Sequence, residues 1–552
     1  MLRRLCFIVL AVCPSLVNSA EVHLPAQEAV VSSQQLTSEG IALGAMRGET
    51  VFLWLDYRNL SSDPQRFTFD VGEMKGVSSD FKHLLAWYKD ANARKSVWHS
   101  GKQLLVEELL VNDPELVVPD HDKRGNRIKF HKVSKKNFLT TEELEKLPVG
   151  KDGRIRMSAI EYPISDSEQF LPRTLAGGES GKLLLALTIG PDARPGRRKT
   201  NLSIRIGMQR ANLPLVLIIN PYVLKAPNIE YSIFYRGLLD NYANTMSSER
   251  KTPLQLKREF AHISAAKYVN PVIYQPVTSG EDFEDYMKVR MGQRLSSDKL
   301  YFFDSEIIRL VKAGESRLLQ RRLERIRRVL GPTVKAAFMV DDEPSKNHVA
   351  NVLSLYNLFH KISFGIFISG KVENFEGLTL PAATYVFSGE PKSAVAADVH
   401  SRGGRIFSYA NPQVGVIVPL AIRFNYGFSL LQNDYDGAML YAYQDSRGSL
   451  WSDFDGRYRD HMFSYPISSG LLDTVSWVAY RQAITDASYY QTLLLAGSEL
   501  NRSSCVDRRL AHNLGSLIMK LHTITIGDED NYRRKILVAL DEVHHALNNC
   551  LL

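Results

Sequence analysis

Short runs of apolar residues, separated by turn-forming residues, occupy the N-terminal part of the chain. The runs at residues 49–56, 182–189 and 199–206 have the length and composition of β-strands. Glycine and proline between residues 190 and 196 are typical of a hairpin connection between the last two runs. The pattern predicts a β-sandwich domain over residues 21–227.

Strand-like and helix-like patterns alternate after Pro227. Helical periodicity is clear at residues 253–268, 316–330 and 348–362. Strand-like runs lie at residues 231–235, 271–275, 300–303, 334–340, 365–368, 384–387, 405–409 and 437–443. Eight strands with intervening helices predict a (β/α)8 TIM-like barrel.

The barrel is assigned to residues 228–470, and the remaining residues, 471–552, are expected to be helical. The clearest C-terminal helical patterns are at residues 471–487 and 532–551. The sequence therefore predicts an α/β protein that has an N-terminal β-sandwich domain, a TIM-like barrel and C-terminal helices.

The first twenty residues have the pattern of a signal peptide. Arg3 and Arg4 precede a short apolar run, and Ser19 and Ala20 provide the small residues of a cleavage site. We therefore expect a secreted or periplasmic protein with a signal peptide at residues 1–20. No later run is apolar for about 18 residues, so no stable membrane insertion is expected.

Cysteine usage predicts neither a disulfide scaffold nor a zinc site. The four cysteines lack zinc-ligand spacing, and two of them fall in the signal peptide. Cys505 and Cys550 remain, either as a disulfide or as two buried thiols. The Asp-rich loops near residues 434 and 453 lack the ligand pattern of a calcium loop. No metal or cofactor is predicted.

Composition and charge narrow the function classes. The chain is 44% hydrophobic and 23% charged, which excludes a disordered or coiled-coil protein. Its formal net charge of +8 is mild for 552 residues. An arginine-rich stretch at residues 317–328 has apolar residues at helical spacing, which favours an outer barrel helix over a nucleic-acid surface. No nucleic-acid partner is predicted.

One predicted barrel strand ends in three adjacent carboxylates. The run at residues 334–340 leads directly into Asp341, Asp342 and Glu343. Barrel enzymes place their active sites at the C-terminal ends of strands. Crowded, partly buried carboxylates have a raised pKa, as a general acid requires. The alternative is a solvated acidic turn closed by Pro344.

A second candidate region is the aromatic-rich segment at residues 434–465. Eight of its 32 residues are aromatic, and aspartates lie between them. Aromatic faces and carboxylates suit a carbohydrate cleft, although aromatic residues also build cores. The neighbouring polar residues favour Tyr441, Tyr443, Trp451 and Asp453 as substrate-binding residues.

These motifs resemble glycoside hydrolase family 123 and its uncharacterised relatives. The resemblance is carried by Asp342-Glu343-Pro344 and by residues 403–412 and 436–443. Residues 103–111 resemble the family's N-terminal sandwich. Its C-terminal helical signature is matched by Trp477, Arg481, Asp486 and Tyr489. Asp341 and Ala483 depart from the family pattern, and neither replaces the acidic pair.

The resemblance implies a retaining β-N-acetylgalactosaminidase in which the 2-acetamido oxygen of the substrate is the nucleophile. Glu343 would then be the general acid/base, and Asp342 would orient the acetamido nitrogen. Tyr409, Tyr441 or Tyr443 would hold the acetamido group. The matched segment 403–412 adds Asn411 to the candidate substrate-binding residues.

Two functions follow from the sequence. The first is an exported glycoside hydrolase that acts on a glycan or polysaccharide through Asp342 and Glu343. The alternative is a noncatalytic extracellular glycan-binding or matrix protein on the same fold, since a fold does not fix a function. The intact acidic pair favours the enzyme.

Overall fold

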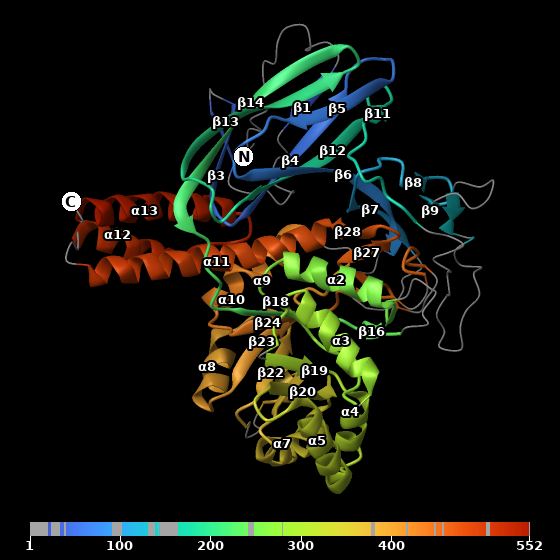
Figure 1. Ribbon diagram of the computed structural model, residues 1–552, viewed down its shortest axis with the longest axis vertical. Helices are drawn as coiled ribbons and strands as arrows, with labels where there is room; N and C mark the ends of the chain where they lie inside the picture. The colour runs from blue at the N-terminus through green and yellow to red at the C-terminus, as the bar shows by residue number, and fades with distance from the viewer. Residues whose placement is uncertain are drawn as a thin grey trace, which may run out of the picture.

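The protein combines two β-sheets, a parallel barrel and a set of C-terminal helices, as a computed structural model shows (Figure 1). The structure describes residues 20–23, 34–37, 40–90, 102–130, 138–141, 143, 164–240, 248–278, 280–297, 299–376, 381–415, 418–446, 449–454, 458–503 and 508–550. Residues 1–19 of the expected signal peptide and Cys505 lie outside these ranges.

The larger N-terminal sheet has seven antiparallel strands. In spatial order they are β1 (Ala20–His23), β4 (Thr50–Asn59), β12 (Ser180–Ile189), β6 (Val77–Asp90), β7 (Gln103–Val111), β28 (Gly470–Thr474) and β27 (Ser464–Ile467). Its last two strands come from the C-terminal part of the chain, so this sheet joins residues that lie far apart in the sequence.

The second sheet has six strands. They are β11 (Arg173–Leu175), β5 (Gln65–Val71), β13 (Gly196–Ile206), β14 (Gln209–Val223), β3 (Gly40–Arg47) and β2 (Gln34–Thr37). Leu53 and Leu185 of the first sheet share one core with Ile204 and Leu215 of the second. The expected hairpin at residues 190–196 is wrong, because β12 and β13 belong to different sheets and the connection crosses between them.

Short strands complete the β-structure. They are β8 (Val117–Asp120), β9 (Gly125–Lys129) and β10 (Phe138–Thr140) in one sheet, and the pairs β16 (Leu238–Leu239) with β17 (Arg250–Lys251) and β25 (Gln444–Asp445) with β26 (His461–Met462).

Eight parallel strands form the barrel, which confirms the expectation from the sequence. In chain order they are β15 (Glu230–Ile233), β18 (Val269–Pro271), β19 (Lys299–Phe302), β20 (Lys335–Asp342), β21 (Gly365–Gly370), β22 (Thr384–Ser388), β23 (Arg405–Tyr409) and β24 (Gly437–Leu440). β15 pairs with both β18 and β24, and a bridge between Ile273 and Phe302 closes the ring between β18 and β19.

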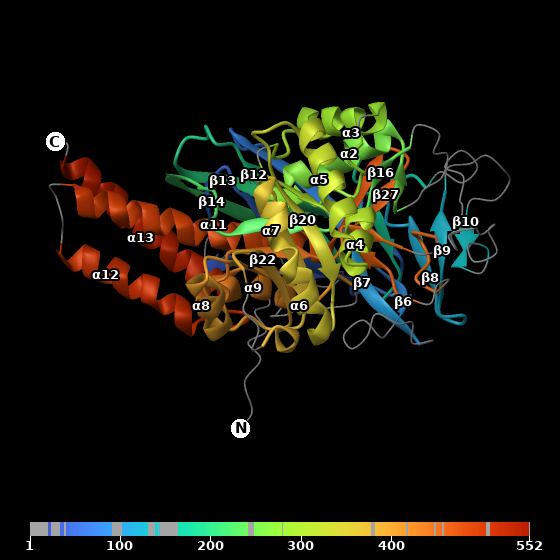
Figure 2. The same cartoon turned by 90° about the horizontal axis from the view of Figure 1, so that it is seen from below.

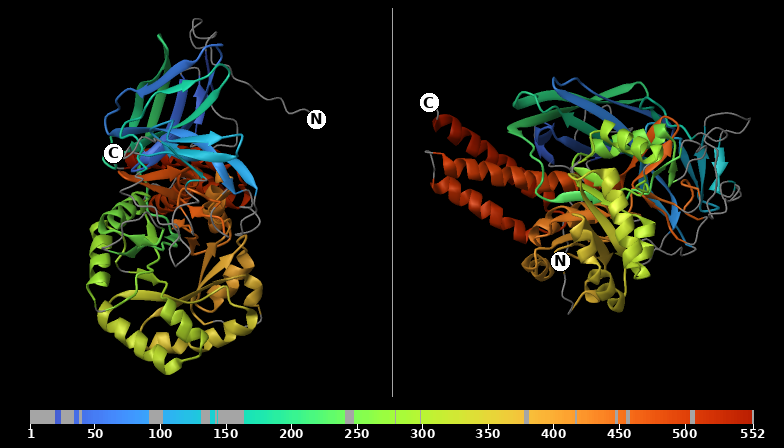
Figure 3. Two further views of the ribbon diagram at one scale, coloured as in Figure 1. Left: turned by 90° about the vertical axis from the view of Figure 1, so that its right-hand side faces the viewer. Right: turned by 60° about the horizontal axis from the view of Figure 1, so that its bottom comes forward.

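Alternating residues of the barrel strands face inward and outward. Met339 and Phe407 pack inside the barrel, whereas Phe338 and Ile406 pack in the core shared with the surrounding helices. Those helices are α2 (Pro253–Ala265), α3 (Glu281–Gly292), α4 (Ser305–Lys312), α5 (Ser316–Leu330), α6 (Lys346–Ser354), α7 (Tyr356–Lys361), α8 (Ser393–Ser401), α9 (Pro419–Tyr426) and α10 (Phe428–Gln432), with the short η1 (Val372–Asn374) (Figure 3).

The chain returns from the barrel to the larger sheet before its C-terminal helices begin. The helix expected from residue 471 starts at Val475, because residues 470–474 form β28 and pair with β7. The hydroxyl of Thr474 accepts a hydrogen bond from the backbone N–H of Trp477 and so caps the helix. The pairing partner is 360 or more residues away, which local periodicity does not reveal.

The C-terminal helices extend to one side of the molecule (Figure 2). They are α11 (Val475–Arg502), α12 (Arg508–Met519), η2 (Lys520–Thr523) and α13 (Glu529–Cys550). Cys550 is disulfide-bonded. Among the described helices, none combines the length and apolar character needed to cross a bilayer.

Candidate functional site

Polar side chains gather where the barrel strands end, which is where barrels of this type carry their active sites. Strand β20 ends at Asp342, and Glu343 follows it directly. Asp342 and Glu343 are exposed, whereas Asp341 is fully buried. The two exposed carboxylates form the acidic pair of the candidate site.

An irregularity in β20 decides which carboxylates reach the mouth of the barrel. Met339 packs inside the barrel, and Val340 packs in the outer core. Regular alternation would turn Asp341 inward. Asp341 instead contacts Lys312 of α4, because the pairing with β21 shifts register between Met339 and Asp342. The three carboxylates are therefore crowded as expected, but only Asp342 and Glu343 are exposed at the mouth of the barrel.

Asp342 lies between a hydrogen-bond donor and two negative charges. The hydroxyl of Ser369, on β21, donates to Oδ1 of Asp342 over 2.7 Å. Although the Asp342 residue as a whole is exposed, the protein around its carboxyl removes part of its hydration and so raises the pKa of Asp342, and the charges of Glu343 and Asp341 raise it further. The Ser369 hydrogen bond and the charge of Lys312 act in the opposite direction. A carboxyl with a raised pKa at a strand end is a candidate for catalysis.

Glu343 is held by the backbone and by one tyrosine. Its φ angle of 50° lies in the left-handed region, which residues other than glycine adopt at a cost in energy. Its backbone N–H donates to the carbonyl of Ser369 at 3.2 Å. The hydroxyl of Tyr409, at the end of β23, donates to Oε1 of Glu343. Burial and this hydrogen bond raise the pKa of Tyr409, so the phenol keeps its proton.

A second polar cluster lies where β15 and β24 end. Tyr441 donates its hydroxyl to Oδ2 of Asp445 over 2.6 Å and accepts a hydrogen bond from Nη1 of Arg236 over 3.1 Å. Arg236 also forms ion pairs with Asp445, at 3.3 Å, and with Glu249. Such convergent charged and phenolic groups suit the recognition of sugar hydroxyls.

Tyr274 lies beside the second cluster, with the guanidinium of Arg236 5.9 Å from the centroid of its ring. Its ring stacks on Phe303 with centroids 4.4 Å apart. Burial raises the pKa of Tyr274, and the charges of Tyr441 and Asp342 raise it further, while Arg236 lowers it. Tyr274 therefore lies within electrostatic range of both the acidic pair and the second cluster.

The sequence reasoning missed Arg236 and Tyr274. Arg236 directly follows the predicted strand at residues 231–235, so a search for polar residues past each strand would have found it. Tyr274 fell inside the predicted strand at residues 271–275, but β18 ends at Pro271.

Asn411 lies two residues beyond β23 and is mostly buried. Its backbone N–H donates to the hydroxyl of Tyr426 at 2.8 Å, and the side-chain amide of Asn425 donates to its carbonyl at 3.1 Å. Its Nδ2 has no hydrogen-bond partner among the described residues. The structure thus places Tyr409 at the end of β23, Asn411 on the loop that follows it and Tyr441 directly after β24.

Three candidate substrate-binding residues are corrected. Tyr443 and Trp451 are 0% exposed and Asp453 is 4% exposed. The Tyr443 hydroxyl hydrogen-bonds to His262 within the outer barrel core, and Trp451 packs in a core with the N-terminal sheet. Asp453 accepts the backbone N–H of Asp90 over 2.9 Å. These three side chains are therefore enclosed by the barrel core or the N-terminal sheet, whereas Tyr409, which is also buried, contacts Glu343 at the mouth of the barrel.

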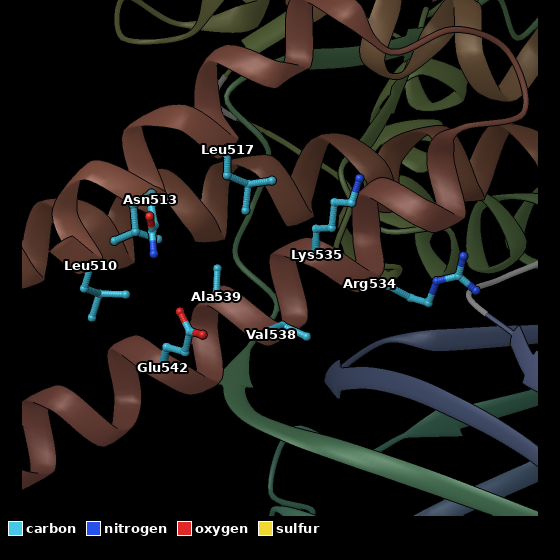
Figure 4. A pocket seen from close by; sticks show the side chains of 9 residues that line it. Leu510, Asn513, Leu517, Arg534, Lys535, Val538, Ala539 and Glu542 are labelled. Carbon is cyan, nitrogen blue, oxygen red and sulfur yellow. The ribbon is translucent and has the colours of Figure 1, made fainter. Parts of the chain in front are cut away.

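The groove between α12 and α13 is a separate hollow of about 290 Å³ (Figure 4). Leu510, Leu514 and Val538 are among its lining residues, with Lys535 towards one end and Glu542 towards the other. It lacks a pair of carboxylates, so we assign it no catalytic role. Among the described residues, no group of three histidine, cysteine, aspartate or glutamate side chains is placed to hold a metal ion.

Comparison with known proteins gives a likeness in fold alone. No family model matches the sequence, and no curated protein matches it. A family 123 glycoside hydrolase from Clostridium perfringens, described in a study of glycolipid glycan hydrolysis, matches with a TM-score of 0.56 and 8% identity. The match covers 96% of this chain and 98% of that one. The arrangement of the barrel with its accompanying sheets is thus one seen in a glycoside hydrolase.

Two further solved structures are less similar. Xylanase 10C from Cellvibrio japonicus matches with a TM-score of 0.31 and 8% identity over 85% of this chain and 98% of that one. An endo-1,4-β-mannanase from Rhizomucor miehei has a TM-score of 0.27 and 9% identity over 38% of this chain and 86% of that one.

Proposed function

We propose that the protein is an exported glycoside hydrolase that cleaves a β-linked 2-acetamido sugar, similar to N-acetylgalactosamine, from a glycan or polysaccharide. The acidic pair at the end of β20 carries this proposal, because Asp342 and Glu343 are adjacent, exposed and held by different donors. The fold shared with a glycoside hydrolase supports it. The leader pattern of the first twenty residues supports export.

The proposed mechanism is retaining and substrate-assisted. Glu343 protonates the leaving oxygen and then activates water, and Tyr409 holds its carboxyl in place. Asp342 accepts the acetamido N–H and stabilises the positive charge that develops as the acetamido oxygen attacks the anomeric carbon. Two neighbouring residues are able to fill these roles because no enzyme carboxylate has to reach the opposite face of the sugar.

The second cluster supplies binding groups. Arg236, Tyr441 and Asp445 offer both donors and acceptors for hydroxyls, and the guanidinium of Arg236 lies 5.9 Å from the ring centroid of Tyr274. The stacked rings of Tyr274 and Phe303 offer an aromatic surface beside them.

The test compares the wild type with Glu343→Gln on chromogenic β-glycosides of N-acetylgalactosamine, N-acetylglucosamine, galactose and glucose. We expect release from the 2-acetamido sugars only, and a loss of kcat of at least about a hundredfold in Glu343→Gln with little change in KM. Glu324→Gln, an exposed carboxyl on α5, is the matched control and should retain full activity. Equal turnover by Glu343→Gln would exclude the proposed role. Saturable glycan binding without release from any substrate would support the noncatalytic alternative.

A further inference from the structure

Asp341 is a buried carboxylate directly behind the acidic pair. Lys312 of α4 donates to its Oδ1 over 2.8 Å, and Nδ1 of His348 on α6 lies 2.7 Å from its Oδ2. The side chain of Asp341 is 1% exposed, whereas those of Lys312 and His348 are 48% and 31% exposed. Asp341 is therefore anchored to two barrel helices outside the strand.

The same carboxylate also holds the backbone of the site. The backbone N–H of Asp342 donates to Oδ1 of Asp341 over 2.8 Å. The next residue, Glu343, has the left-handed backbone that turns it toward Tyr409. A strained conformation persists where its surroundings fix it. Asp341 fixes the residue immediately before the strained one.

We propose that Asp341 and Lys312 form a positioning pair that fixes the Asp342–Glu343 turn and sets the acidic limit of the activity. This inference rests on the proposed function and adds a role for two residues that need not touch the substrate. Asp341 acts through the backbone of Asp342, and Lys312 anchors Asp341 to α4.

The charges around Asp342 act on its ionisation in opposite directions. Glu343 and Asp341 disfavour its ionised form, while Lys312 and the Ser369 hydroxyl favour it. Two neutral phenols also act on Asp342, Tyr409 at the end of β23 and Tyr274 in the segment after β18. His348 contacts Asp341, which in turn binds the backbone of Asp342. In the proposed mechanism Asp342 must be ionised to stabilise the positive charge that develops on the acetamido group. The acidic limit of kcat/KM then follows the ionisation of Asp342 in the free enzyme.

Asp341→Asn and Lys312→Met test the charge effect with opposite signs. Asparagine keeps an oxygen for the Asp342 amide but removes the negative charge, so the acidic limit of kcat/KM should move to lower pH. Lys312→Met removes the positive charge, so the limit should move to higher pH. Lys312 is half exposed, and this variant should fold normally. Lys288→Met, which breaks a surface ion pair with Asp285 on α3, is the control and should leave the limit unchanged.

Asp341→Ala tests the positioning effect. It removes both the charge and the oxygen that holds the Asp342 amide, so kcat should fall at least about tenfold below that of Asp341→Asn. Rescue by asparagine distinguishes loss of the backbone contact from loss of charge. Equal kcat in the two variants would overturn the positioning role.

Differential proton titration separates this inference from the proposed function. The proteins to titrate are the wild type, Asp341→Asn and Lys312→Met. Each is compared with the same protein that also carries Asp342→Asn, and the difference between the two titration curves gives the ionisation of Asp342 without any substrate. Shifts in opposite directions would support the charge effect even if no glycoside is cleaved. Shifts in the same direction, or none, would overturn it even in a protein that cleaves 2-acetamido sugars and is inactivated by Glu343→Gln.

Discussion

At the residue scale, the sequence Asp341-Asp342-Glu343 does not indicate which two carboxylates form the acidic pair of the site. Alternation along a regular strand would place Asp341 and Glu343 on one face and Asp342 on the other. The structure pairs Asp342 with Glu343, because a register shift turns Asp341 outward and a left-handed φ angle follows at Glu343. The sequence predicts the acidic strand end, but the bulge depends on pairing with β21 and leaves no clear local signal.

Tyr409→Phe tests whether the phenol supports the general acid. The change removes the side-chain hydrogen bond that the Tyr409 hydroxyl donates to Glu343, so we expect kcat to fall about tenfold to a hundredfold with KM nearly unchanged. Unchanged kcat would contradict the role.

Tyr385→Phe is the matched control for that experiment. Tyr385 lies on the neighbouring strand β22, is fully buried and donates its hydroxyl to the carbonyl of Pro381 over 2.9 Å. Its loss should cost about 1 kcal/mol of unfolding free energy, as loss of one buried hydrogen bond does, with kcat retained.

At the element scale, the barrel strands were predictable and the aromatic-rich segment was not. Most barrel strands are compact apolar runs, so local pattern suffices to find them, whereas β18 (Val269–Pro271) contains Asn270 and was predicted to continue to residue 275. Trp451, Tyr465 and Leu472 instead pack against the N-terminal sheet, where the ring of Trp87 lies 6.1 Å from that of Trp451 and 5.2 Å from that of Tyr465. These aromatic residues join the barrel segment to the sheet. Sequence composition does not distinguish such a core from a sugar-binding surface.

Trp451→Ala tests this core assignment. A fully buried tryptophan replaced by alanine should cost about 3–5 kcal/mol of unfolding free energy. The folded variant should keep the wild-type KM, because Trp451 lines no described part of the site. Tyr441→Phe should show the reverse, with a raised KM and a smaller loss of stability, because its hydroxyl joins Arg236 to Asp445. A raised KM for Trp451→Ala, with unchanged unfolding free energy, would mean that Trp451 binds substrate after all.

At the scale of the whole molecule, a buried charge network joins the N-terminal sheets, the barrel and the C-terminal helices. Asp486 of α11 binds Arg423 of α9, at 2.8 Å, and Arg533 of α13. Arg533 also lies 3.6 Å from Glu49, which directly precedes β4. Tyr489 of α11 donates to Glu49 over 2.6 Å. The family resemblance singled out Asp486 and Tyr489, and the structure shows that both support the assembly of the chain.

This network includes a carboxyl that titrates near neutrality. Glu529 at the start of α13 is 1% exposed, and its Oε1 has no hydrogen-bond partner among the described residues. Burial raises the pKa of Glu529 from 4.5 to about 7, although the charge of Arg423 lowers it. The folded protein therefore holds this proton more tightly than the unfolded chain does. The contribution of Glu529 to stability is full below about pH 4.5 and is lost as the pH rises to about 7.

Glu529→Gln should remove this pH dependence, because glutamine resembles the protonated carboxyl at every pH. A difference of about 2.5 pKa units corresponds to about 3 kcal/mol of unfolding free energy. Urea unfolding of the wild type and the variant at pH 4.5 and pH 8 measures it. From pH 4.5 to pH 8, the unfolding free energy of the wild type should fall by about 3 kcal/mol more than that of the variant. Equal pH dependence in the two proteins would mean that the pKa of Glu529 is the same in the folded and unfolded states, with Arg423 compensating for its burial.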